Sequence, residues 1–177
     1  MHVDHVYTEL YDRIPPLARA AVEGLDAEQL AWAPADGANT IAWLTWHAAR
    51  VQDAHVAEIM EVEQLWATGD FAGAFGLEPD PSNSGFGHGP DDIAAVRPEG
   101  PEAVLRYLDT VHERTERLLV GLTDSELDRI VDRRWDPPVT LGVRLVSIAD
   151  DSLQHVGQAL YVRGLLDGYR GPGDPRS

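Results

Sequence analysis

The sequence contains no cysteine, which excludes disulfide bonds, thiolate nucleophiles and thiolate metal ligands. Any metal site in this chain must therefore be built from histidine, aspartate and glutamate side chains. Lysine is missing as well, so all 14 basic residues are arginines, against 30 acidic residues and a net charge of −16 at pH 7. Because no basic cluster interrupts this charge, nucleic acid and anionic membrane surfaces would repel the chain, and we expect neither as a partner.

Long apolar runs are also missing, since no stretch approaches the roughly 18 residues that a membrane-spanning helix needs. The first residues, MHVDHVYTELYDR, have neither the basic start nor the apolar core of a secretory signal, so we expect a cytoplasmic protein. With 177 residues, 44% of them hydrophobic and 25% charged, the chain suits one domain with a sizeable core. We expect this domain to span residues 1–170 and residues 171–177, GPGDPRS, to form a flexible tail.

Apolar residues recur every three or four positions along four stretches, which is the spacing of a helix with one buried face. The four stretches are residues 2–24, 40–66, 101–120 and 140–166. The pair Pro15-Pro16 predicts a kink or a division of the first stretch into two segments, and Asn39 or Thr40 is placed to cap the second. Because no strand pattern is found, we expect an all-α fold, a four-helix bundle.

The long connection between the second and third helices, residues 67–100, is rich in glycine, proline and aspartate and has no helical period. A connection of this length in a small domain is usually either functional or disordered. It carries Phe71, Phe75, Phe86 and His88, so we expect parts of it to pack against the bundle. We predict that it shapes or covers the entrance to a site.

Polar residues interrupt the buried stripes of the second and fourth helices. Asp151 and His155 are four residues apart and lie one above the other on the same helical face, while His47 lies on the stripe of the second helix. Burying a carboxylate or an imidazole without a partner costs roughly 1–3 kcal/mol or more, and a shared divalent metal would avoid this cost. Three protein ligands leave a position open for water or substrate, as in catalytic sites. Among the metals that suit these ligands Zn²⁺ comes first, with Ni²⁺, Fe²⁺ and Mn²⁺ also admissible.

Other interpretations of these residues stay open. His155 could be a core histidine bonded to a backbone or side-chain acceptor, and Asp151 could pair with Arg50 or with His155 itself. His55 is a rival ligand, but it lies two helical turns from His47, roughly 12 Å away, which argues against one shared ion. We expect the remaining histidines to be terminal, loop or surface residues: His2, His5, His88 and His112.

Two segments and a turn carry a resemblance to a known family. The segments are Asn39 to Val51, NTIAWLTWHAARV, and Asp151 to Gln158, DSLQHVGQ, and the turn is GLDAEQL at residues 24–30, echoed at residues 121–127. Over about residues 5–168 the chain resembles the DinB/YfiT-like superfamily of metalloenzymes, within the branch that includes mycothiol-dependent maleylpyruvate isomerase-like proteins. The resemblance implies a DinB-like four-helix bundle and a metal held by His47, Asp151 and His155.

The resemblance also implies a function, namely a metal-dependent S-transferase or isomerase that uses a low-molecular-weight thiol such as mycothiol. The metal would stabilise that thiol, or a water molecule, as the anion. A small-molecule substrate would lie near Trp43, Trp46 and Gln158, although packing in the core is the simpler interpretation of the two tryptophans. Water in place of the thiol would make the protein a metal-dependent hydrolase. A homodimer is implied by the resemblance as well.

One departure from the family favours an alternative. The family usually has Glu or His where this chain has Asp151, and the shorter side chain predicts a weaker or displaced metal. The alternative is a non-enzymatic, stress-associated binding or scaffold bundle with a vestigial metal site. An open cleft beside His47 would favour an enzyme, whereas a closed core would favour the scaffold.

Overall fold

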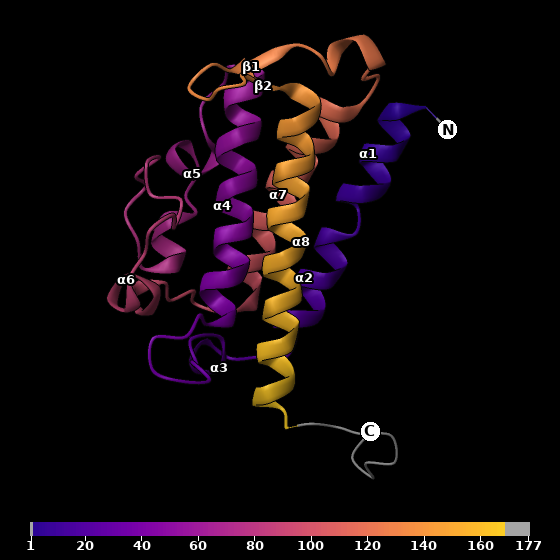
Figure 1. Ribbon diagram of the computed structural model, residues 1–177. Helices are drawn as coiled ribbons and strands as arrows, with labels where there is room; N and C mark the ends of the chain where they lie inside the picture. The colour runs from indigo at the N-terminus through magenta and orange to yellow at the C-terminus, as the bar shows by residue number, and fades with distance from the viewer. Residues whose placement is uncertain (1, 169–177) are drawn as a thin grey trace, which may run out of the picture.

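A computed structural model describes residues 2–168, which form a mostly helical protein with a small strand pair (Figure 1). The predicted tail, residues 171–177, lies outside the described residues. The helices are α1 (Val3–Tyr11), α2 (Ile14–Val22), α3 (Ala27–Leu30), α4 (Ile41–Met60), α5 (Leu65–Thr68), α6 (Pro90–Ala95), α7 (Pro101–Leu119) and α8 (Leu141–Leu166). The other elements are the 3₁₀ turns η1 (Ala72–Phe75) and η2 (Asp124–Glu126) and the strands β1 (Ile130–Asp132) and β2 (Val139–Thr140). Within this described part, no helix combines the length and the hydropathy of a membrane-spanning segment.

Helices α4 and α8 lie side by side and run in opposite directions through the centre of the fold (Figure 1). Helix α2 packs against α8, and α7 packs against both α4 and α2. The core between them is aromatic and aliphatic, and the buried Tyr11 hydroxyl donates a hydrogen bond to the Leu145 carbonyl oxygen at 2.8 Å. This packing turns the face of α4 that carries His47 toward the face of α8 that carries Asp151 and His155.

Local signals set the helix starts, as predicted. The double proline divides the first stretch into α1 and α2, with Pro15 and Pro16 in the first turn of α2, where a missing N–H is tolerated. Thr40 caps α4 by accepting a hydrogen bond from the Trp43 N–H at 3.0 Å. Thr140 caps α8 in the same way.

Helix α4 is shorter than predicted and ends at Met60. The next residue, Glu61, has a left-handed conformation with φ 56°, which ends the helical hydrogen-bond ladder. The buried carboxylate of Asp53 then accepts the backbone N–H groups of Leu65 and Trp66, at 3.0 and 2.8 Å. These two bonds start α5 as a separate helix, so the predicted end of the second helix was wrong.

The expectation that the chain has no strand is also wrong in one place. Strands β1 and β2 pair antiparallel, with Ile130 opposite Thr140 and Asp132 opposite Val139. Strands of three and two residues are too short to show an alternating pattern in the sequence. The β1–β2 hairpin lies over the N-terminal end of α8 (Figure 1), where Arg144 donates a hydrogen bond to Asp132 at 2.6 Å.

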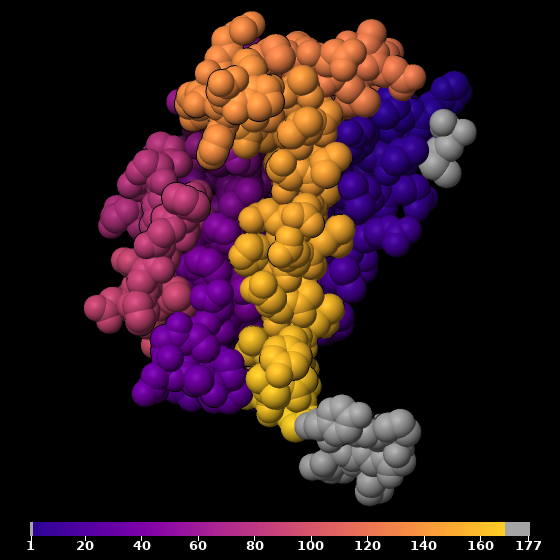
Figure 2. Space-filling model, in the orientation of Figure 1, coloured from indigo at the N-terminus to yellow at the C-terminus, as the bar shows by residue number. Residues whose placement is uncertain are grey.

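The connection between α4 and α7 lies along α4 and includes α5, η1 and α6 (Figure 1). Parts of it pack as expected, since Phe75 and Phe71 are buried, with ring centres 5.6 Å from Trp66 and 5.0 Å from Tyr107 respectively. Phe86 differs, because 94% of it is exposed. Figure 2 shows α4 recessed between this connection on one side and α8 on the other.

Candidate metal centre

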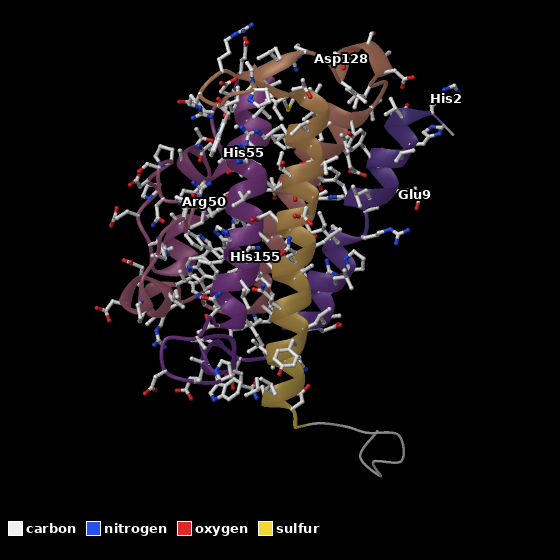
Figure 3. All side chains as sticks on the ribbon, viewed as in Figure 1. His2, Glu9, Arg50, His55, Asp128 and His155 are labelled. Atoms are coloured by element: carbon white, nitrogen blue, oxygen red, sulfur yellow. The ribbon has the colours of Figure 1, made fainter. Side chains whose placement is uncertain are left out.

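Three side chains with potential metal-ligand atoms meet between α4 and α8. His47 comes from α4, and Asp151 and His155 come from α8. Their candidate ligand atoms all lie within 4.8 Å of one another, and the two imidazole ring centres are 4.6 Å apart. Figure 3 shows His155 where α4 and α8 meet, on the same side of the molecule as Arg50 and His55 of α4. The structure therefore brings together the three residues that the sequence singled out.

Backbone carbonyl groups orient both imidazoles. His47 Nδ1 lies 2.6 Å from the Ser84 carbonyl oxygen, and His155 Nδ1 lies 2.8 Å from the Asp151 carbonyl oxygen. A carbonyl oxygen can only accept a hydrogen bond, so each Nδ1 carries a hydrogen, and in the neutral form of either ring Nε2 keeps a free lone pair. An imidazole whose Nδ1–H is held in this way is the usual form of a metal-ligating histidine.

The electrostatic setting of His47 favours the same neutral form. Burial lowers the pKa of His47, because the imidazolium would lose its hydration between the helices, and the bond to Ser84 opposes this only in part. The ring is therefore neutral at pH 7. A neutral imidazole is the form that binds a metal ion.

Asp151 supplies the clearest sign that a cation fits here. Its Oδ2 atom is buried and has no hydrogen-bond partner within residues 2–168, and His155 Nδ1 is 3.6 Å away, beyond hydrogen-bond length. A buried carboxylate oxygen without a partner is costly. Two free imidazole lone pairs and this oxygen form a donor set that suits a divalent metal.

The alternative pairing of Asp151 with Arg50 is wrong. Arg50 is fully buried, and its guanidinium group is used by other partners. These partners are the side chains of Asp53, Tyr107 and Gln64 and the carbonyl oxygens of Pro81 and Asn83. Arg50 thus holds the backbone directly before Ser84, the residue that orients His47. Sequence reasoning missed this role, because it depends on contacts between α4 and a distant loop.

A series of aromatic contacts, beginning with Trp43 on the face of the ring, also holds His47. The Trp43 indole stacks on the His47 ring, with centres 4.7 Å apart and planes inclined by 9°. Its Nε1–H donates to His88 Nδ1 at 3.1 Å, and His88 Nε2 in turn bonds to Asn83 Oδ1 at 2.9 Å. His88 is also stacked on Trp46. His88 is a loop residue, as expected, but its contacts with Trp43, Trp46 and Asn83 were not predicted, because no local pattern in the sequence marked them.

Gly85 lets the connection approach α4 this closely. Its φ is +93°, and a Cβ added there would lie 2.6 Å from His47 Nδ1 and 3.0 Å from the Trp46 ring. A side chain at this position would therefore collide with the residues that build the site. The connection covers His47 only because residue 85 is glycine.

A cavity of about 580 Å³ opens beside the three candidate ligands. Helix α4, the connection, the hairpin and α8 all contribute to its wall, in agreement with the recess in Figure 2. The lining residues are His47, Val51, His55, Ser84, Phe86, Asp132, Arg134, Trp135, Arg144 and Asp151. Two of the candidate ligands, His47 and Asp151, therefore face a space large enough for a small molecule.

The residues predicted to contact a substrate do not line this cavity. Trp43 and Trp46 are buried, where they pack around His47 and beneath the connection. Gln158 is exposed on α8, outside the cavity wall. The wall is instead built by other residues of α4 and the connection, by the hairpin, which sequence reasoning had taken as a plain loop, and by Arg144 and Asp151 of α8.

Two other histidines have roles that differ from that of His47. His55 lines the same cavity, but it lies outside the group of candidate ligands and contacts Arg144. His112, expected at the surface, is half-buried instead, with its Nε2 3.1 Å from the Asp12 carboxylate. With Glu116, these two residues form a second group of potential ligands on the α7 side of the fold.

Comparisons with known proteins agree with this structure. A protein from Enterococcus faecalis, described as the conserved protein of a locus, has a crystal structure that matches with a TM-score of 0.86 and 28% sequence identity. The match covers 95% of this chain and 99% of that one. No curated protein matches the chain. The family model of the DinB superfamily matches residues 10–159, and the chain is a member of the DinB superfamily.

Proposed function

We propose that this protein is a divalent-metal-dependent enzyme that acts on a small molecule, as an S-transferase or isomerase with a low-molecular-weight thiol such as mycothiol. The observation that supports this most is the open cavity beside His47 and Asp151. A vestigial scaffold would need no such space, so the cavity favours an enzyme over the non-enzymatic alternative. We further propose that α2, α4, α7 and α8 form the four-helix bundle that frames the site.

The residues that would hold the metal are His47, Asp151 and His155. A bound divalent ion, with Zn²⁺ first among the candidates, would lower the pKa of a thiol or a water molecule and stabilise its anion. The chain's own part is to present two imidazoles and one carboxylate in a fixed geometry. The Ser84 carbonyl and the Trp43 ring hold His47, and the Asp151 carbonyl holds His155.

The thiol has to come from a second molecule, because the chain has no cysteine. The cavity has room for a thiol and a small electrophile together. Ser84 and Phe86 of the connection lie in its wall, so the connection would shield one side of the reacting groups from water.

Metal analysis of untagged protein tests the site directly. We expect about one equivalent of divalent metal in the wild type and its loss in the Asp151→Ala/His155→Ala double variant. Two controls should keep the metal, namely His55→Ala in the same cavity and Asp12→Ala/His112→Ala in the second group. Absence of metal from all proteins, or equal loss in the controls, would overturn the proposal.

Activity assays then separate the thiol reaction from hydrolysis. Metal-loaded protein is incubated with an electrophile in the presence and absence of mycothiol, and product formation is followed by mass spectrometry. A thioether or isomerised product that forms only with the thiol supports the proposal. Turnover that proceeds equally well without the thiol would identify a hydrolase and refute the thiol-dependent function.

A further inference from the structure

The wall of the cavity carries more positive charge than the protein as a whole would suggest. Two arginines, Arg134 and Arg144, balance the two aspartates of the lining, Asp132 and Asp151, in a chain whose net charge is −16. A divalent ion at the candidate centre would leave this lining with a net positive charge. With that ion bound, the cavity would favour an anion on a molecule that otherwise repels anions.

Arg144, a residue of this wall, has a buried hydrogen-bond donor without a partner among residues 2–168. Its side chain is only 12% exposed, its Nη2 donates to Asp132 at 2.6 Å, and its Nη1 lies 3.5 Å from His55 Nε2. Its Nε is buried and has no partner within residues 2–168. A buried guanidinium N–H without an acceptor is costly, and an oxygen of a bound anion would satisfy it once the side chain turns this N–H toward the cavity.

The mouth of the cavity is aromatic. Phe86 is 94% exposed and Trp135 is 66% exposed, and both line the cavity from different segments, the connection and the hairpin. Large aromatic side chains exposed together beside a cavity commonly mark a binding surface. Glycines with positive φ flank Phe86 on both sides, Gly85 at +93° and Gly87 at +79°.

We propose that the cavity binds a small carboxylate with an apolar or aromatic body. Arg144 turns its Nε–H toward the cavity, where the carboxylate accepts it. The apolar body lies between Phe86 and Trp135, and the other end of the ligand faces the candidate metal centre. A single free N–H beside the acidic Asp132 suits a singly charged carboxylate better than a doubly charged phosphate. The position of the ligand's other end, next to the candidate metal centre, rests on the proposed function. The contact between the carboxylate and Arg144 does not need the metal.

The test compares 3-phenylpropionate with its uncharged amide, 3-phenylpropionamide, by NMR titration of Zn²⁺-loaded and metal-free protein. We expect the carboxylate to bind about tenfold or more tightly than the amide, which is the size of one charge-assisted hydrogen bond. In Arg144→Gln this preference should disappear. Arg144→Lys, which keeps the charge but lacks Nε–H, should lose most of it. In the matched control Arg117→Gln, at an exposed arginine of α7, the preference should persist.

Phe86→Ala is a second test that remains possible if the Arg144 variants fold poorly. The Phe86 side chain is almost fully exposed, so its removal should not disturb folding. The substitution should weaken carboxylate and amide alike, by about fivefold, because apolar contact is lost and the anion contact is kept. Unchanged binding of both probes in this variant would refute the position of the apolar body.

Other outcomes overturn the anion contact. Equal binding of carboxylate and amide in protein that holds metal would refute it and leave the proposed function standing. Tighter binding of phenyl phosphate than of the carboxylate would refute the carboxylate assignment. An Arg144-dependent preference in protein that fails to bind any metal would support the anion contact and refute the proposed function.

Discussion

Replacing Gly85 by alanine tests whether the connection holds His47 in place. An added Cβ would lie 2.6 Å from His47 Nδ1 and 3.0 Å from the buried Trp46 ring. Gly85→Ala therefore has to lift the connection from α4 and break the bond between His47 and Ser84. Gly87→Ala is a matched control, because its φ is also positive, +79°, and no described atom lies within 4 Å of an added Cβ.

The free energy of unfolding separates two costs. In either variant, holding alanine at a positive φ strains the folded state by about 1–2 kcal/mol. Alanine also lowers the conformational entropy of the unfolded chain, which returns about 0.4–1 kcal/mol of stability. Gly87→Ala should therefore lower the free energy of unfolding by about 1 kcal/mol. Gly85→Ala adds the loss of a buried hydrogen bond, about 1–3 kcal/mol, for a total of about 2–4 kcal/mol.

Urea unfolding of metal-free protein and Zn²⁺ titration check this prediction together. Because the Ser84 carbonyl orients His47, Gly85→Ala should also weaken Zn²⁺ binding by about 10–100-fold, whereas Gly87→Ala should leave it unchanged. Equal destabilisation of the two variants, or unchanged Zn²⁺ affinity in Gly85→Ala, would refute the reasoning.

Two further predictions concern buried charges. Arg50→Met should lower the free energy of unfolding by about 3–5 kcal/mol, because the buried Asp53 carboxylate loses one of its two arginine partners and keeps only Arg114, and because the carbonyl oxygens of Pro81 and Asn83 lose their donor; a negligible change in urea unfolding would contradict this. Hydrogen bonds from Arg134, helped by the charge of Arg144, hold the pKa of Asp132 below its usual value. The stability from Asp132 is therefore present above about pH 4 and lost as the pH falls toward the lower native pKa. Urea unfolding below that pH should show a steeper loss in the wild type than in Asp132→Asn, and equal slopes would disprove the pairing.

Features that depend on neighbours in the chain could be read from the sequence. Thr40 begins α4 because its hydroxyl reaches an N–H three residues ahead, and Pro15-Pro16 divides α1 from α2 because proline restricts the residue before it. The spacing of Asp151 and His155 places both on one face of a helix wherever that helix packs.

Features that depend on distant partners could not be read in this way. The end of α4 and the start of α5 depend on Asp53, whose carboxylate reaches N–H groups twelve and thirteen residues ahead only after the chain has turned. His88 is a loop residue, as expected, but its bonds to Trp43 and Asn83 depend on how the connection packs against α4.

The sequence by itself determined the helical character of this protein, the main breaks between its helices and the absence of thiolate chemistry, because each follows from residue type or from contacts within a turn or two. It also indicated the three candidate ligands, two of them by their spacing. Only the tertiary structure decided that His47 meets Asp151 and His155, residues more than a hundred positions away, and that Arg144 and Trp135 face the same cavity. Such meetings are set by how α4, α8 and the hairpin pack, and packing depends on many weak contacts distributed over the whole chain.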